Sequence, residues 1–143
     1  MIPYQDIIKS ASKSFGIEPA LIAGIIKVES NWDPNATRYE ASINDTSYGL
    51  MQVLLGTAKG VISSSLSYTQ LLQPETNIYI GTKYLYEQLQ TYGTIDKAIS
   101  AYNAGQPTSD NKAYVDSVKW WSSFYSYLIP YGNYLIVPLI LGV

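Results

Sequence analysis

Residues 25–36 read IIKVESNWDPNA, and this stretch joins the end of an apolar helix to a turn. Read as a helix, it places Ile22, Ile25 and Ile26 on one face. Glu29 lies three positions after Ile26 and seven after Ile22, so it points along the same apolar face. A carboxyl group in such surroundings is costly unless it is paired, protonated or functional. Glu29 is therefore the first candidate for a functional residue.

The composition argues against several classes of protein. The 143 residues suit a single domain with its own core. A net charge of −2 and a charged fraction of only 14% argue against a basic nucleic-acid-binding face. The chain has no cysteine and no histidine, which excludes disulfides, thiolate catalysis and a Ser-His-Asp triad. Acid–base chemistry must then fall to a carboxylate, tyrosine or lysine, and no residue cluster has the spacing of a metal site.

Helical patterns cover most of the chain and predict one mainly α domain. The expected helices cover residues 2–16, 18–30, about 52–62, 75–93, 94–105 and 112–128. Residues 35–48 are polar and irregular, so we expect a short β-hairpin or an extended loop there. Residues 63–74 are expected to form a loop, with room for a single turn.

Three short stretches occur in order: VESNWDPNA at 28–36, TSYGLMQV at 46–53 and AISAYNAG at 98–105. Together they resemble the lytic transglycosylases that cleave bacterial peptidoglycan, of the soluble-lytic-transglycosylase type. The resemblance runs from about Tyr4 to about Val118. It implies a lysozyme-like helical domain. Each string alone is weak evidence, but the three in this order are specific.

The resemblance also implies roles for individual residues. Glu29 matches the single catalytic acid of the family, and Ser30 matches the serine that follows it and steadies the helix end. The matches predicted to line the substrate cleft are Ser47, Met51, Gln52, Tyr102, Asn103 and Tyr114. Gly49 is expected to serve backbone geometry. Tyr114 is the least specific match, because tyrosine occurs 14 times in the chain.

In this family one glutamate acts first as a general acid and then as a general base. The resemblance therefore implies cleavage between N-acetylmuramic acid and N-acetylglucosamine with a 1,6-anhydromuramoyl product. No water is consumed and no cofactor is expected. Placement on an apolar face would raise the pKa of Glu29 by desolvation, as a general acid near neutral pH requires.

Three other interpretations remain open. A hydrolysing muramidase on the same fold would need a second carboxylate, for which Asp33, Glu40 and Asp45 are the candidates. A non-catalytic glycan-binding component of a virion or secretion complex would keep the cleft without turnover. If the chain were a purely structural helical protein, the order of the three motifs would be a coincidence.

Residues 120–143 carry no charge and fall outside the resemblance. We expect residues 1–119 to form the transglycosylase domain, with 120–143 as an aromatic and apolar extension. Pro130, Gly132 and Pro138 interrupt the extension as a membrane-spanning helix, so packing on the domain is favoured. The alternative is contact with a membrane or an assembly partner, because tryptophan and tyrosine favour interfaces.

The route to the cell wall is a separate question. The first residues lack the apolar run of a signal peptide. A protein that acts at the cell wall is then expected to be virion-associated or exported by a dedicated system. The peptidoglycan glycan strand is the expected partner, and the sequence predicts no oligomeric state.

Overall fold

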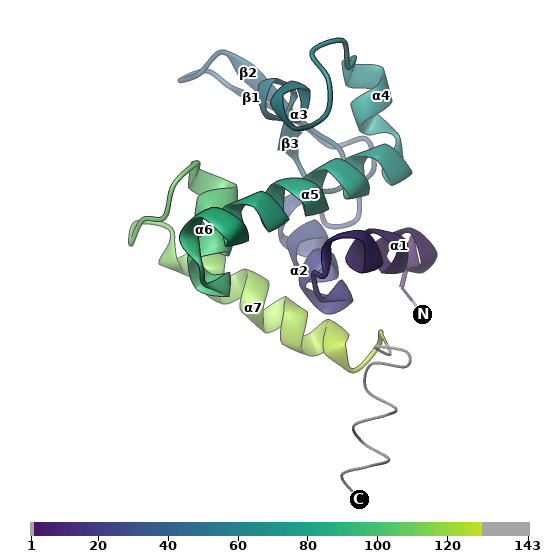
Figure 1. The fold of residues 1–143 in the computed structure, drawn as a ribbon, viewed down its shortest axis with the longest axis vertical. Coiled ribbons are helices and arrows are strands. Elements are labelled where there is room, and N and C mark those ends of the chain that lie inside the picture. Colours follow the sequence, from purple (N-terminus) through teal and green to yellow (C-terminus); the bar gives the residue numbers. More distant parts are fainter. Residues whose placement is uncertain (1, 130–143) are drawn as a thin grey trace, which may run out of the picture.

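Seven α-helices and a three-stranded antiparallel sheet make up residues 2–129, the part of the chain that the computed structural model describes (Figure 1). The helices are α1 (Gln5–Phe15), α2 (Pro19–Ser30), α3 (Leu55–Val61), α4 (Tyr68–Leu72), α5 (Pro74–Tyr92), α6 (Ile95–Ala104) and α7 (Lys112–Ser126). The strands are β1 (Thr37–Glu40), β2 (Asp45–Tyr48) and β3 (Val53–Leu54). The prediction of a mainly α domain with a hairpin near residues 35–48 is confirmed.

Local sequence signals set the ends of the helices around the site. Pro19 occupies the first turn of α2, where its missing N–H is not needed. α2 stops at Asn31, which has a left-handed φ of 51° and donates its N–H to the Lys27 carbonyl. Gly105 ends α6 in the same way with φ 84°. The stop at Asn31 leaves Glu29 in the last turn of α2.

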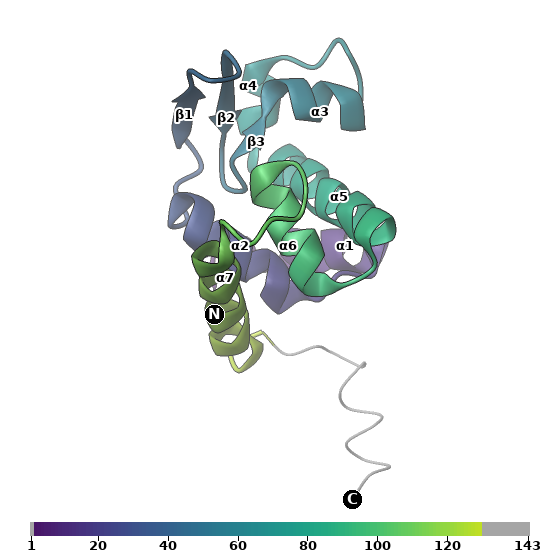
Figure 2. The same cartoon turned by 90° about the vertical axis from the view of Figure 1, so that its left-hand side faces the viewer.

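The long helix α5 lies between two groups of elements (Figures 1 and 2). The sheet, α3 and α4 lie on one side of it, and α2 and α7 lie on the other. Residues 19–26 of α2 are all buried, and this helix packs along α7. At the crossing, a Cβ on Gly24 would lie 2.9 Å from backbone atoms of both Val118 and Ser122. Glycine therefore permits the close approach of these two helices.

The segment after the Gly-Leu-Met-Gln motif differs from the prediction of a helix from about Gln52. Gln52 has φ 48°, β3 follows it, and the helix begins only at Leu55. The Gln52 side chain donates hydrogen bonds to the carbonyls of Ala36 at 2.9 Å and Gly49 at 3.0 Å. These bonds and the pairing of β3 with β2 hold a left-handed turn that a helix cannot continue.

At the C-terminal side, α7 runs to Ser126 with no interruption at residue 119. Residues 120–126 of the predicted extension are thus part of the helix that packs on α2. Residues 130–143 lie outside the described residues, so the expectation for that part stays a prediction. Within residues 2–129 no helix combines the length and apolar character needed to span a membrane.

Candidate active site

Glu29 is hydrogen-bonded to a tyrosine from the neighbouring helix. The Tyr114 hydroxyl, on the first turns of α7, donates to Oε2 of Glu29 at 2.7 Å. Both side chains are partly buried where α2 and α7 pack together. Tyr114, the least specific match in the sequence, is thus placed against the candidate acid itself.

The surroundings of Glu29 change its proton affinity. Burial raises the pKa of the carboxyl from 4.5 to about 7, while the Tyr114 hydrogen bond and the positive charge of Arg38 lower it less strongly. Burial also raises the pKa of the Tyr114 phenol well above its ordinary value, as does the nearby Glu29, so this group stays a donor. A carboxyl group with a pKa near neutrality can both give and accept a proton there.

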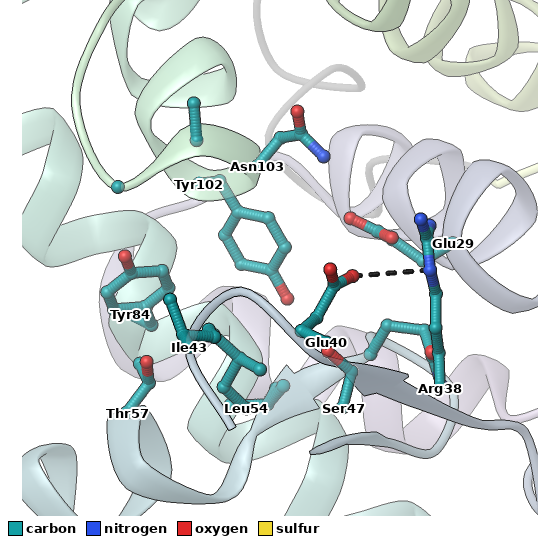
Figure 3. A pocket seen from close by; sticks show the side chains of 14 residues that line it. Glu29, Arg38, Glu40, Ile43, Ser47, Leu54, Thr57, Tyr84, Tyr102 and Asn103 are labelled. Carbon is teal, nitrogen blue, oxygen red and sulfur yellow. Dashed lines mark ion pairs between the residues drawn. The ribbon is translucent and has the colours of Figure 1, made fainter. Parts of the chain in front are cut away.

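Glu29 lies at a cleft of about 560 Å³ between the strands and α6 (Figure 3). Tyr102 and Asn103 come from α6, whereas Arg38, Glu40, Ser47 and Leu54 come from the strands. The lining also includes Ile43, Gln52, Val53, Thr57, Tyr84, Ala104 and Gly105. Four of the six predicted substrate-binding residues therefore line this cleft: Ser47, Gln52, Tyr102 and Asn103.

Met51 is not among the residues that line the cleft, and its predicted contact with substrate stays a prediction. Its side chain is fully buried, and a Cβ on Gly81 would lie 2.6 Å from its Sδ. The backbone of Met51 instead positions Tyr102, because the Met51 carbonyl accepts a 2.7 Å hydrogen bond from the Tyr102 hydroxyl. Tyr102 is thus bonded to residues 48–52, called the motif loop below, and its ring centroid lies 5.4 Å from that of Tyr84.

The motif loop is held by Asn77, a buried residue of α5 that sequence reasoning missed. Its Nδ2 donates to the carbonyls of Tyr48 at 2.8 Å and Leu71 at 2.9 Å, and its Oδ1 accepts from Met51 N–H at 2.7 Å. Gly49 has φ 78°, and a Cβ there would lie 2.8 Å from Cγ of Asn77. The signal in the sequence was a polar residue beside Ile78 on the apolar face of an amphipathic helix.

Two further predicted residues make contacts within the protein. Ser30 donates to the Leu50 carbonyl at 2.7 Å and also lies 3.2 Å from the Ile26 carbonyl. It therefore ties the end of α2 to the motif loop. Asn103 is exposed, and its Oδ1 accepts a 3.0 Å hydrogen bond from Asn111.

Of the three candidates for a second carboxylate, Glu40 alone lines the cleft. It forms an ion pair with Arg38, whose Nε lies 3.2 Å from Oε1 (Figure 3). Asp33 accepts from Asn35 N–H at 2.9 Å, and Asp45 accepts from backbone N–H groups at both oxygens. Those two carboxylates stabilise turns. Within residues 2–129, no three His, Cys, Asp or Glu side chains are grouped so that they could hold a metal.

Comparison with known proteins defines the class. Residues 6–122 match the family model described as Transglycosylase SLT domain. The transglycosylase of Enterobacteria phage PRD1 is 34% identical over 104 residues, which is 73% of this chain and 36% of that protein. The membrane-bound lytic murein transglycosylase C of Actinobacillus pleuropneumoniae serotype 5b is 36% identical over 116 residues, 71% of this chain and 30% of that protein.

A solved structure agrees with this class. The 70 kDa soluble lytic transglycosylase of Escherichia coli superposes with a TM-score of 0.77 at 28% identity, over 89% of this chain and 24% of that one. The chain belongs to the transglycosylase SLT family and has its lysozyme-like fold. The resemblance noted in the sequence is confirmed. The chain spans between 24% and 36% of the length of these relatives.

Proposed function

We propose that this chain cleaves peptidoglycan glycan strands as a lytic transglycosylase, with Glu29 as the acid and then the base. The observation that carries the proposal is the state of the Glu29 carboxyl. This group lies at the cleft, has a pKa of about 7 and accepts a hydrogen bond from Tyr114. Membership in the SLT family and the names of the relatives support the same activity.

The reaction needs one proton carrier. Protonated Glu29 gives its proton to the glycosidic oxygen between N-acetylmuramic acid and N-acetylglucosamine, and the bond from that oxygen to the anomeric carbon breaks. The Glu29 carboxylate then takes the proton of the muramoyl C6 hydroxyl, whose oxygen bonds to the anomeric carbon. The carboxyl is restored and a 1,6-anhydromuramoyl end is formed. This sequence needs neither water nor a cofactor.

The other predicted residues have supporting parts in this proposal. Gln52 offers its Oε1, Asn103 its side-chain amide and Ser47 a hydroxyl, from walls of the cleft on which the sugars would lie; both Nε2 hydrogens of Gln52 are already bonded to backbone carbonyls. Tyr102, which is largely buried, lines the same cleft. Tyr114 acts through Glu29, which it orients by the hydrogen bond.

A second candidate function is supported by the position of Glu40. An inverting hydrolase needs a carboxylate across the cleft from the acid to activate water. Glu40 lines the same cleft as Glu29 and forms an ion pair with Arg38. Hydrolysis would leave a reducing muramoyl end in place of the anhydro ring, so the products distinguish the two reactions.

The test is digestion of purified peptidoglycan by the wild-type chain, Glu29→Gln and Glu40→Gln, with the products identified by mass spectrometry. We expect anhydromuramoyl products from the wild type and from Glu40→Gln, and none from Glu29→Gln. Glu18→Gln is the matched control, because Glu18 is exposed at the other end of α2 and its side chain makes no capping bond. Reducing muramoyl ends that the wild type forms and the Glu40→Gln variant does not would instead establish a hydrolase. Glycan binding by a folded wild type without cleavage would favour a non-catalytic component.

We also infer that the protein reaches the cell wall as part of a virion. The support is its similarity to the transglycosylase of phage PRD1. Detection of the chain in purified particles by mass spectrometry tests this, and its presence only in a cellular export fraction would favour a dedicated export system.

Beside the packing on the domain that the sequence favours for residues 120–143, we infer that the exposed face of their α7 part contacts a membrane or an assembly partner. The support in the described part is on α7, where Trp120 and Phe124 are 62% and 42% exposed and stack with nearly parallel rings. Co-sedimentation with lipid vesicles, compared between the wild type, Trp120→Ala and a chain ending at residue 130, tests membrane contact. Equal sedimentation of all three would contradict it.

A further inference from the structure

Arg38 is the chain's only arginine, and it lies in the cleft. In the part of the chain that the structure describes, it is also the only cationic side chain of the cleft lining. The side chain is 75% exposed, and its Nε lies 3.2 Å from Oε1 of Glu40. Among residues 2–129 its two terminal nitrogens make no hydrogen bond. The outer edge of the guanidinium is thus open to a ligand.

We propose that Arg38 binds a carboxylate carried by the muramoyl residue, either the lactyl carboxylate itself or one on the attached stem peptide. The inference rests on the proposed function, since it names the group by which this cleft recognises the same substrate. A planar guanidinium binds a carboxylate through two parallel hydrogen bonds, which a lysine ammonium cannot reproduce.

The position of Arg38 fits the muramoyl side of the scissile bond. Figure 3 shows its guanidinium joined to Glu40, at the end of the cleft where Glu29 is labelled. The charge of Arg38 lowers the pKa of Glu29, so the two groups interact. A muramoyl residue whose glycosidic oxygen meets Glu29 carries its lactyl substituent on the same ring. A carboxylate from that ring is therefore brought close to Arg38.

Charge balance gives a second reason. Two carboxyl groups, Glu29 and Glu40, line the cleft, and the whole chain is slightly acidic. An anionic strand entering this cleft is opposed by Glu40 unless a cation compensates. Arg38 supplies that cation. The ion pair with Glu40 is made at Nε, and both residues belong to the cleft lining.

Binding to a turnover-deficient protein tests the inference. Glu29→Gln serves as the background, and calorimetry measures its affinity for four glycan samples. Peptide-free strands carry the free lactyl carboxylate, and their methylamidated form is neutral. Peptide-bearing strands carry stem carboxylates, and their methylamidated form lacks them. We expect Arg38→Gln to weaken binding of a carboxylate-bearing sample roughly tenfold and to leave its neutral counterpart unchanged.

Each glycan sample and its methylamidated form make a pair, and the pair in which only the charged member loses affinity identifies the carboxylate. Loss in the peptide-free pair indicates the lactyl group, and loss in the peptide-bearing pair indicates the stem peptide. Arg38→Lys is expected to lose less, because it keeps the charge. Lys59→Gln removes a positive charge from the exposed face of α3, outside the cleft lining, and should change no affinity.

Two results would overturn the inference. In the first, Arg38→Gln weakens the binding of charged and neutral strands equally, or weakens neither. Arg38 then does not bind a carboxylate, although glycan binding and the proposed function stand. If the Glu29→Gln background binds no glycan of any kind while remaining folded, both the inference and the proposed function are wrong.

Discussion

The Tyr114 hydroxyl donates a 2.7 Å hydrogen bond to Oε2 of Glu29 and so joins α7 to the last turn of α2 across 85 positions of the chain. A hydrogen bond to a carboxylate stabilises its ionised form. It therefore opposes burial, the larger effect, which raises the pKa of Glu29 to about 7. The proton affinity of the proposed acid depends on this contact between two helices.

Tyr114→Phe should raise the pKa of Glu29 further, because burial remains and the hydrogen bond is lost. In the proposed mechanism activity needs protonated Glu29 in the free enzyme, so kcat/KM is expected to fall as the pH rises through this pKa. We expect that falling limb to move up by roughly one pH unit. The measurement is kcat/KM on soluble glycan strands over a range of roughly pH 5 to 9, in which most proteins stay folded.

Tyr68→Phe is the control for that profile, since Tyr68 is 52% exposed and lies on α4, outside the cleft lining. Its profile should match that of the wild type. A limb that stays in place or moves to lower pH in Tyr114→Phe would mean that the hydrogen bond does not tune Glu29. A change in KM alone would instead indicate the direct substrate contact predicted from the sequence.

Glu29→Gln should stabilise the fold at alkaline pH while abolishing activity. The folded pKa of about 7 lies above the ordinary value of 4.5, so the folded state binds the proton more tightly. The stability that this proton contributes is complete below the unfolded pKa and is lost as the pH rises through the folded one. Glutamine stays neutral, so the variant should gain about 1–3 kcal/mol over the wild type at high pH.

Urea unfolding at three pH values measures this difference, which should shrink steadily as the pH is lowered toward 4.5. Glu18→Gln, at the exposed start of the same helix, should show a difference that hardly varies with pH. A gain that is the same at all pH values would be inconsistent with a raised Glu29 pKa.

Asn77→Ala should strongly destabilise the protein, because it leaves the Tyr48 carbonyl and the Met51 N–H of the motif loop, and the Leu71 carbonyl of α4, without this partner. Buried groups left unpaired in this way predict a loss of about 2–4 kcal/mol in the free energy of unfolding. Chemical denaturation gives the value. Gln90→Ala, on an exposed position of the same helix, should stay within about 0.5 kcal/mol of the wild type. Equal effects of the two substitutions would exclude a special part for Asn77.

The features that sequence reasoning recovered depend on neighbours along the chain. Pro19 and Gly105 mark helix ends by backbone preferences that act locally. The apolar face that carries Glu29 follows from helical periodicity. The ordered motifs then located Tyr102 and Asn103 through a family resemblance, and both line the cleft.

The features that it missed depend on contacts between distant segments. Gln52 was expected in a helix because its neighbours are apolar, but its bond to the Ala36 carbonyl spans 16 positions. The Met51 side chain packs in the core against Gly81, where the missing Cβ leaves room for it. This contact spans 30 positions of the sequence, so no local pattern predicts it. The place of Arg38 in the cleft depends on how the hairpin folds back from α2, so a single exposed arginine gave no signal.

Gly24→Ala should destabilise the protein and reduce its activity together. The added Cβ would lie 2.9 Å from the Ser122 nitrogen and from the Val118 oxygen, and both are backbone atoms that cannot rotate away. α2 and α7 must separate to admit the methyl group, at a cost of about 1–3 kcal/mol. Because α2 carries Glu29 and α7 carries Tyr114, the same separation lengthens their hydrogen bond. Urea unfolding and the pH profile of kcat/KM measure the two effects.

Gly60→Ala is the matched control for that substitution. Gly60 also lies in a helix, α3, but a Cβ there would meet nothing within 4 Å. Alanine at this position should raise the free energy of unfolding by about 0.5 kcal/mol, because it favours the helix over the unfolded chain. The two substitutions add the same methyl group, so opposite signs would identify the contact between α2 and α7 as the cause. A loss of stability in Gly24→Ala without a shift in the pH profile would show that Tyr114 follows Glu29 when the helices move apart.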